Sequence, residues 1–324
     1  MDNNEWINLK ARLLSAGSAI LTGYPAESFI AKSTAGPGAG GSGSVFFSID
    51  GHRVRLGIIQ TGPVTIRHEG NGEVLLSLDG ESFPGTLERP SLHCPRQAFI
   101  TLTSSCIFRC RYCNVPNLPG RRKSADEIEA LVESVMGDID AISLTSGVQE
   151  NIEEEEAYTV SIVRRLIKFG LPIGVSIYPT PLTPGLLHDA GAVEVKFNLE
   201  AATPAIFAEM CPGLNNTTIR DILKESVRVF GRGHVFSNVI LGLGETDEEM
   251  ESCLDELCRD GIIPVVRPLN PLTLPEFGRP EPDRIIKIFR FLEGRLTFYK
   301  LDTTLALTMC PACTGCDMIP GREG

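Results

Sequence analysis

The fold is decided by the stretch Gln97-Ala-Phe-Ile-Thr-Leu102, which is followed closely by Cys106-Ile-Phe-Arg-Cys110-Arg-Tyr-Cys113. The first segment is short and apolar, which predicts a buried β-strand. The second places three cysteines in the loop directly after that strand. Proteins with parallel sheets build their active sites at the carboxyl ends of the strands. The stretch therefore predicts a ligand-binding loop at that edge of a sheet.

Strands and helices alternate downstream of this loop. Ser124 with Glu127, and Thr246 with Glu249, form capping boxes that mark two helix starts. We expect helices at 124–136, 157–169, 185–189, 218–230, 246–259 and 282–292, and further strands at 141–144, 172–177, 193–199, 235–241 and 262–267. This alternation implies right-handed βαβ units and a parallel sheet. Six strands predict an α/β fold of the partial (β/α)6 barrel type, open on one side.

Residues 1–90 have a different pattern. A helix is expected near 5–14, a small-residue segment follows at 33–44, and turn residues separate four short strands at 45–49, 53–59, 64–68 and 74–78. This pattern predicts a small antiparallel sheet. The predicted organisation is an N-terminal β-rich extension (1–90), a barrel domain (91–300) and a cysteine-rich tail (301–324).

The charge balance limits the possible partners. The chain of 324 residues has 30 Lys+Arg and 41 Asp+Glu, a formal net charge of −11. A nucleic-acid-binding protein would need a basic face, so we expect no nucleic-acid partner. There is no apolar run of about 18 residues, so we expect no membrane span. The first six residues do not resemble a secretory signal, and we expect a cytoplasmic protein.

Ten cysteines in such a chain point to metal binding or chemistry rather than to disulfides. Cys211, Cys253 and Cys258 are expected to be packing residues. Six others form two groups, Cys106, Cys110 and Cys113, and Cys310, Cys313 and Cys316. Thiolates suit iron–sulfur clusters or zinc, but zinc needs a fourth ligand, and the first group has no further Cys or His within ten residues. Three thiolates can hold a cubane cluster and leave its fourth iron open.

The C-x3-C-x2-C spacing, with an aromatic residue before the last cysteine, resembles the signature of the radical S-adenosylmethionine (SAM) superfamily. The resemblance implies a [4Fe-4S] cluster on Cys106, Cys110 and Cys113 whose open iron binds SAM. One electron, from a ferredoxin-type donor, then cleaves SAM to methionine and a 5′-deoxyadenosyl radical. That radical abstracts hydrogen from an unactivated carbon. No side chain of the chain itself is assigned a catalytic role.

The same resemblance implies a SAM pocket. Ser146 stands where the family has a Gly-Gly-Glu-like turn for the SAM amino group, although Thr145-Ser146-Gly147 departs from that pattern. Asn198 and Glu200 alternate on one strand and are expected to bind the ribose. The remaining residues are expected to contact adenine. Tyr112 would accept a hydrogen bond through its backbone carbonyl, and Gly242 and Leu243 would pack closely against the ring.

Residues 36–41 match the pattern G-x-G-x-x-G, but they precede a strand and not a helix. A dinucleotide site needs a helix N-terminus behind its glycines. We therefore expect a flexible loop or a substrate-covering segment.

The second cysteine group forms a ligand loop near the end of the sequence, and Cys94 is the candidate for its fourth ligand. Two interpretations stay open, a structural zinc site and an auxiliary [4Fe-4S] cluster at the substrate end of the barrel. Biotin synthase and lipoyl synthase dismantle such a cluster to supply sulfur. Electron transfer is the other use, and the sequence does not choose between them.

Within the superfamily, residues 198–200 and 242–245 resemble the biotin synthase-like group. The whole chain is similar to the two-component lipoate synthases of archaea and some bacteria. This implies sulfur insertion into an octanoyl chain on a lipoyl-carrier protein, together with a second radical SAM subunit. Five basic residues bracket the first cysteine group: Arg109, Arg111, Arg121, Arg122 and Lys123. They form either a basic docking patch for the carrier or an ordinary solvated loop. The alternatives are another radical SAM outcome (biotin-type sulfur insertion, methylation, rearrangement or peptide modification) and a non-catalytic iron–sulfur carrier.

Overall fold

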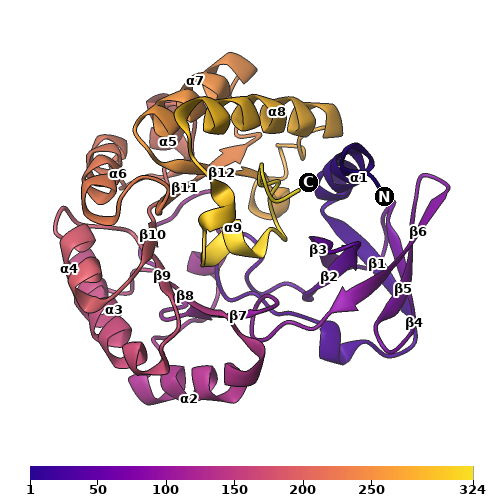
Figure 1. Ribbon diagram of the computed structural model, residues 1–324, viewed down its shortest axis with the longest axis horizontal. Coiled ribbons are helices and arrows are strands. Elements are labelled where there is room, and N and C mark those ends of the chain that lie inside the picture. Colours follow the sequence, from indigo (N-terminus) through magenta and orange to yellow (C-terminus); the bar gives the residue numbers. More distant parts are fainter. Residues whose placement is uncertain (324) are drawn as a thin grey trace.

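The computed structural model describes residues 1–323. Its larger part is a six-stranded parallel sheet in the order β12-β11-β10-β9-β8-β7. The strands are β7 (Gln97–Thr101), β8 (Ala141–Thr145), β9 (Ile173–Ser176), β10 (Glu194–Lys196), β11 (Val235–Leu241) and β12 (Ile263–Pro268). Strands β7 and β12 form the two edges of the sheet, so the curved sheet is an open barrel, with its helices along the outer side in Figure 1. The predicted α/β partial barrel is confirmed.

The helices around this sheet are α2 (Ala125–Val135), α3 (Ile152–Leu166), α4 (Thr183–Ala190), α5 (Pro204–Met210), α6 (Asn216–Phe230), α7 (Asp247–Arg259) and α8 (Pro282–Tyr299). Both predicted capping boxes are present, at the starts of α2 and α7. Helix α3 begins five residues earlier than expected, because Asn151 caps it and three glutamates in its first turn favour the positive end of the helix dipole.

The N-terminal region forms a second sheet that closes on itself. It contains β1 (Ser18–Gly23), β2 (Ser44–Ile49), β3 (His52–Ile59), β4 (Thr65–Gly70), β5 (Glu73–Leu78) and β6 (Glu81–Glu88), in the order β1-β3-β2-β6-β5-β4. The antiparallel prediction is correct for the pairs among β2, β3, β6, β5 and β4, but it missed β1 and β6. Strand β1 runs parallel to both β3 and β4 and closes the N-terminal barrel.

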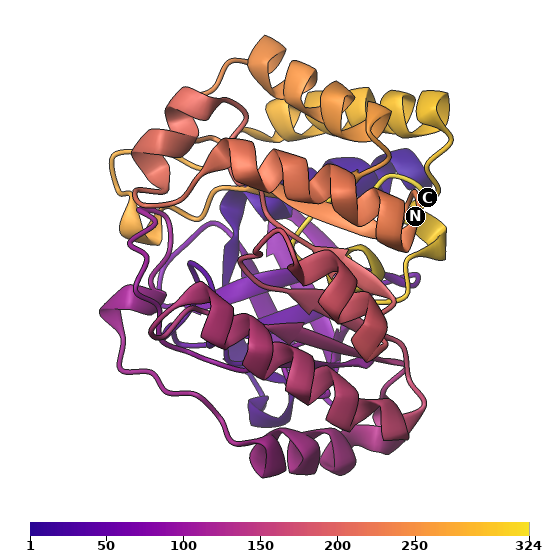
Figure 2. The same cartoon turned by 90° about the vertical axis from the view of Figure 1, so that its left-hand side faces the viewer.

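Helix α1 (Asn3–Ala16) lies between the N-terminal barrel and α8. In Figure 1 the N-terminal barrel occupies the open side of the parallel sheet. Figure 2, turned by 90°, shows helices of the parallel sheet in front and the strands of the N-terminal barrel behind them. In the part of the chain that the structure describes, no helix is long and apolar enough to cross a membrane.

The segment at the start of helix α9 (Met309–Cys313) connects the tail to the parallel sheet. The backbone of Met309 exchanges hydrogen bonds with the side chain of Gln97, the first residue of β7, at 2.8 and 3.0 Å. Thr308 donates to Glu194, the first residue of β10. Residues 308 and 309 therefore meet the amino ends of β7 and β10, whereas the loop with Cys106 follows the carboxyl end of β7. The expectation that the second cysteine group lies at the substrate end of the barrel stays a prediction.

Candidate active site

A cavity of about 430 Å³ lies between the parallel sheet and the N-terminal barrel. Its size is that of small-molecule sites in enzymes. All seven predicted thiol ligands line it: Cys94, Cys106, Cys110, Cys113, Cys310, Cys313 and Cys316. The first cysteine loop (residues 106–113) and the second cysteine loop (residues 310–316) therefore face one common space, which we call the central cavity.

The first cysteine loop is held against the turn that follows β8. The Ile107 amide donates to the carbonyl of Val148 at 2.8 Å. A Cβ atom added to Gly147 would lie 2.2 Å from the carbonyl oxygen of Ser105, so only glycine permits this approach. The turn at residues 145–147 therefore fixes where the first cysteine loop begins.

The three thiols of this loop are half-buried. Burial raises the pKa of Cys106, and it raises the pKa of Cys113 to about 12. Contact with Cys211 raises the pKa of Cys110. Among residues 1–323, no three Cys, His, Asp or Glu side chains form a ready-made metal site, and the thiol of Cys110 contacts that of Cys211. Three soft thiols on one loop beside a cavity nonetheless fit an iron–sulfur cluster as a donor set.

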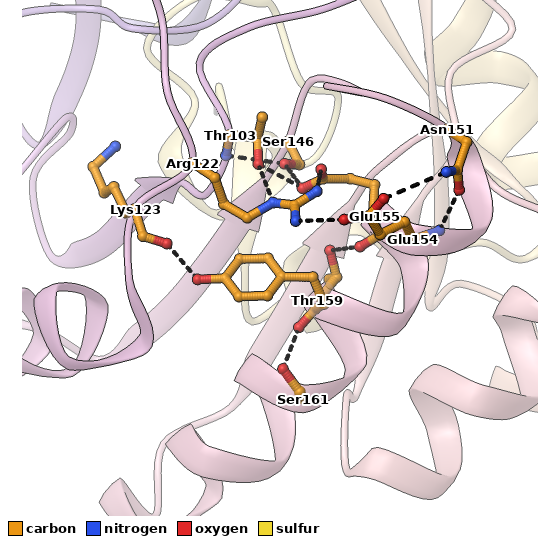
Figure 3. A network of polar contacts seen from close by, with 10 residues as sticks. Thr103, Arg122, Lys123, Ser146, Asn151, Glu154, Glu155, Thr159 and Ser161 are labelled. Atoms are coloured by element: carbon orange, nitrogen blue, oxygen red, sulfur yellow. Dashed lines mark hydrogen bonds and ion pairs between the residues drawn. The ribbon is translucent and has the colours of Figure 1, made fainter.

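Ser146 belongs to a buried polar network, shown in Figure 3. Its hydroxyl donates to Glu155 at 2.5 Å and accepts from the Thr103 amide at 3.0 Å. Glu155 is 2% exposed and pairs with Arg122 at 2.8 Å. The network joins the segments on both sides of the first cysteine loop to α3. Ser146 lines the central cavity, and its contact with the SAM amino group stays a prediction, because its proton is already donated to Glu155.

The basic residues around the first cysteine loop are largely neutralised. Arg111 pairs with Glu209 at 2.5 Å and with Glu276 at 2.8 Å. The others interact as follows: Arg121 with Glu127, Arg122 with Glu154 and Glu155, and Lys123 with the carbonyl of Thr101. Arg109 is exposed. A basic docking patch is therefore not formed here, because neighbouring carboxylates balance most of its charge.

Asn198 and Glu200 are brought together as predicted. The Asn198 amide donates to the Glu200 carboxylate at 3.0 Å, and both residues line the central cavity. Burial raises the pKa of Glu200, and the Asn198 hydrogen bond opposes that shift. Glu200 has a φ of 63°, a left-handed conformation that non-glycine residues seldom adopt. Such strain is typical of residues aimed into functional sites, but the ribose contact itself stays a prediction.

Of the residues predicted to contact adenine, only Tyr112 lines the central cavity. The amides of Gly242 and Leu243 donate to the carboxylate of Glu245 at 2.7 and 2.8 Å, and neither residue lines the central cavity. Tyr112 does line it, and its hydroxyl accepts a hydrogen bond from Cys211 at 3.6 Å. The glycine-rich turn thus serves a local hydrogen-bond network. Contact of Gly242, Leu243 and the Tyr112 carbonyl with adenine remains a prediction.

Asn238 is a site residue that the sequence analysis missed. It lies on β11, lines the central cavity and is 6% exposed. Its side-chain oxygen is buried and has no hydrogen-bond partner within residues 1–323. A buried acceptor without a partner costs about 1–3 kcal/mol, which indicates that a bound donor satisfies it. Its alternation with Ile240, which also lines the cavity, was the available sequence signal.

The second cysteine loop is joined by Cys94 as predicted. Cys94 packs against Cys313, and their hydrogen bond raises the pKa of Cys94 and lowers that of Cys313 to about 7. The thiols of Cys310 and Cys316 lie close enough to act on Cys94 as well. Four thiols from two distant segments therefore lie near one another, although they are not arranged as a ready-made metal site. Four thiols suit either a tetrahedral zinc or a cubane cluster as a donor set.

Positive charges surround this second group of thiols. Lys196 Nζ and Arg267 Nη2 each lie 3.2 Å from the sulfur of Cys310, and Arg55 Nη1 lies 3.9 Å from that of Cys316. Arg267 also pairs with Asp317 at 2.8 Å. Burial and the nearby cations lower the pKa of His93 to about 3, so this imidazole is neutral. Cations next to thiols favour the thiolate form and hence metal binding.

Comparison with known proteins agrees with this geometry. Residues 100–257 match the model of the Radical SAM superfamily. The chain is similar to the lipoyl synthase of Corynebacterium diphtheriae, 25% identical over 60% of this chain and 56% of that protein. It is also similar to the lipoyl synthase of a Nocardioides species, 28% identical over 60% of this chain and 62% of that protein. The chain thus spans little more than half the length of these curated relatives.

Among solved structures, a radical SAM methyltransferase from Sphaerobacter thermophilus is similar, with a TM-score of 0.55 and 19% identity. The match covers 74% of this chain and 76% of that one. At this identity the likeness concerns the fold.

Proposed function

The chain carries a radical SAM domain, and from that premise we propose that it inserts sulfur into an unactivated C–H bond of a protein-bound octanoyl chain. The observation that carries the proposal is the central cavity, onto which both cysteine groups open. A substrate inside it would lie beside the cysteine residues of both loops. The curated relatives named lipoyl synthase support the same chemistry.

When bound, a cluster with SAM at the first cysteine loop supplies the 5′-deoxyadenosyl radical, and an auxiliary cluster at the second supplies sulfur. Cys106, Cys110 and Cys113 would hold the first group, and Cys94, Cys310, Cys313 and Cys316 the second. Asn198 and Glu200 bind the ribose hydroxyls, and Asn238 accepts a hydrogen bond from the nucleoside or the substrate. The oxygen of Asn238 is free for this purpose.

The wall of the central cavity suits an acyl chain. Phe46, Phe99, Phe108 and Tyr178 line it, together with aliphatic side chains. Such a wall excludes water, which protects a carbon radical from side reactions. It offers contact area to a saturated chain, whose binding is worth about 0.8 kcal/mol per buried CH₂ group.

The partners follow from this function. The substrate is an octanoylated lipoyl-carrier protein, and a ferredoxin-type donor delivers the electron. We propose a second radical SAM subunit as a further partner.

A second candidate rests on the four thiols near Cys94. Four thiols with no open position are the donor set of structural zinc sites. With zinc there, the central cavity would serve a radical reaction that uses one cluster and transfers no sulfur.

Metal content separates the two. After anaerobic reconstitution, we expect about eight irons per chain, two cubanes' worth, and about half of that in the Cys310/Cys313/Cys316→Ala variant. A Cys253/Cys258→Ala variant, which alters two buried cysteines of α7, serves as the control. Half the iron plus one zinc in the wild type would favour the second candidate.

Product mass tests the reaction itself. Incubation with SAM, a reductant, the partner subunit and octanoylated carrier should shift the carrier mass by sulfur. Formation of 5′-deoxyadenosine without that shift would contradict sulfur insertion and leave the radical SAM assignment intact.

A further inference from the structure

The N-terminal region contacts the second cysteine loop along its backbone. The carbonyls of Cys313, Thr314 and Gly315 accept hydrogen bonds from Arg53 Nη1 at 3.3 Å, Lys10 Nζ at 2.7 Å and the Arg55 amide at 2.7 Å. Every one of these donors belongs to α1 or β3. Consecutive carbonyls in a ligand loop set the directions of the side chains between them, so these bonds orient Cys313 and Cys316.

A buried ion pair reinforces this contact. Lys10 is 0% exposed and Glu323 is 1% exposed, and their charged atoms are 2.5 Å apart. The indole of Trp6 donates to the other carboxylate oxygen of Glu323 at 2.8 Å, and the Ile319 amide donates at 3.0 Å. Fully bonded buried pairs specify one arrangement, and removing one partner leaves an uncompensated charge. The tail therefore has one docked position against α1.

Side-chain packing completes the wall. A Cβ atom on Gly315 would lie 2.5 Å from the ring of Phe46, which belongs to β2. Phe46 is also in the small apolar cluster that contains Cys94 and Cys313. The N-terminal barrel thus touches the second site through its backbone, its charges and its core.

We propose that α1 and the N-terminal barrel are the scaffold that makes the second cysteine site competent to bind metal, with Lys10 and Glu323 as its positioning residues. The inference rests on the proposed function in so far as the second site holds a metal centre. It gives residues 1–90 a role inside the enzyme. It also separates the two sites, because the first cysteine loop lies on the parallel sheet and does not depend on these contacts.

The test is Lys10→Met in the full chain. Its control is Arg12→Met, because Arg12 lies on the same helix but pairs with Asp79 and Glu81 at the barrel surface. Iron, sulfide and zinc per chain are measured after reconstitution, together with reductive SAM cleavage. We expect Lys10→Met to lose at least half of the second-site metal and to keep SAM cleavage within about twofold of wild type. Arg12→Met should keep both.

A second variant separates positioning from simple loss of stability. In Lys10→Met/Glu323→Gln no charge is left buried, and the amide can still accept from Trp6. We expect this double variant to recover part of the lost metal, which a general loss of stability would not predict. Amide hydrogen exchange over residues 307–323 of the metal-free chain gives a readout that needs no metal, and exchange there should rise at least tenfold in Lys10→Met.

Two results would overturn the scaffold. One is wild-type metal content and unchanged tail exchange in Lys10→Met. The other is equal loss of metal from both sites. A wild-type chain that binds metal only at the first loop contradicts the proposed function instead. In that case the hydrogen-exchange experiment on the metal-free chain alone tests whether Lys10 holds the tail in place.

Discussion

The two cysteine loops share one cavity but are anchored differently. The side-chain ion pairs of the first join Arg111, which is 38% exposed, to the still more exposed Glu209 and Glu276, beside its backbone hydrogen bond from Ile107 to Val148. Exposed pairs contribute about 0–1 kcal/mol. The second is held by Lys10 and Glu323, both essentially buried, where removal of one partner costs about 3–5 kcal/mol. The ion pairs beside the first loop are therefore solvent-exposed, whereas the ion pair beside the second is buried.

The charged side chains around the two cysteine loops have opposite signs. The carboxylates of Glu155 and Glu200 act on the thiols of the first loop and raise their pKa values further. Arg55 and Arg267 act on Cys316 in the opposite direction. A cationic cofactor such as SAM suits the first environment, and an anionic metal–thiolate group suits the second.

The largest effect is expected from removing one thiol of each loop. Cys110→Ala should reduce SAM cleavage to background and leave about four irons at the second loop. Cys316→Ala should retain SAM cleavage and abolish transfer of sulfur to the carrier. Deoxyadenosine is measured by chromatography and the product by mass. If both variants lose SAM cleavage equally, the two loops are not functionally separate.

Matched glycine substitutions come next. Gly147→Ala puts a Cβ atom 2.2 Å from the Ser105 carbonyl, a backbone atom that cannot turn away, whereas Gly315→Ala meets the ring of Phe46. Overpacking costs about 1–3 kcal/mol, which is about 5-fold to 150-fold in an equilibrium constant. We expect Gly147→Ala to weaken SAM cleavage and Gly315→Ala to weaken only the second metal site.

Gly294→Ala on α8 is the control, because a Cβ atom there meets nothing within 4 Å. An equal response of both sites to Gly147→Ala and Gly315→Ala would contradict the separation.

A smaller effect is expected from the charge beside Cys310. Lys196→Met removes a cation 3.2 Å from that sulfur, so second-site metal should be lost to a chelator several-fold faster. Lys196→Arg keeps the charge and should lose metal at nearly the wild-type rate. Chelator kinetics followed by absorbance measure this, and identical rates in Lys196→Met and wild type would show that the cation does not hold the metal.

The smallest effect is expected in the stability of the fold at acidic pH. Arg121 and the Ser124 amide lower the pKa of Glu127 to about 2 from an ordinary value of 4.5. A lowered folded-state pKa stabilises the fold above the ordinary value, and this contribution is lost as the pH falls from 4.5 towards 2. An NMR titration of the metal-free chain should find Glu127 ionised at about pH 3.5. A midpoint near 4.5 would show that the pair with Arg121 is not populated.

The sequence predicted the parallel sheet well, because its capping boxes and apolar strands are local signals. It missed β6, which contains Pro84 and Gly85, residues that usually argue against a strand. The proximity of Cys94 to the second cysteine loop was predictable from its residue type, and its role as a metal ligand stays a prediction.

The pairing of Arg111 could not be predicted, because Glu209 and Glu276 lie 98 and 165 positions away. The sequence does not show that the carboxylate of Glu245 accepts hydrogen bonds from the amides of Gly242 and Leu243. The contact of these two residues with adenine stays a prediction. The free oxygen of Asn238 is likewise visible only once its neighbours are in place.

The separation of 313 positions between Lys10 and Glu323 has a consequence for biogenesis. Proteins emerge from the ribosome amino end first, and contacts of such long range form slowly. The N-terminal barrel and the first cysteine loop are synthesised well before residue 310 appears. The contact between α1 and the tail can therefore form only after almost the whole chain has been synthesised. A chain cut before residue 310 would lack three of the four thiols of the second group.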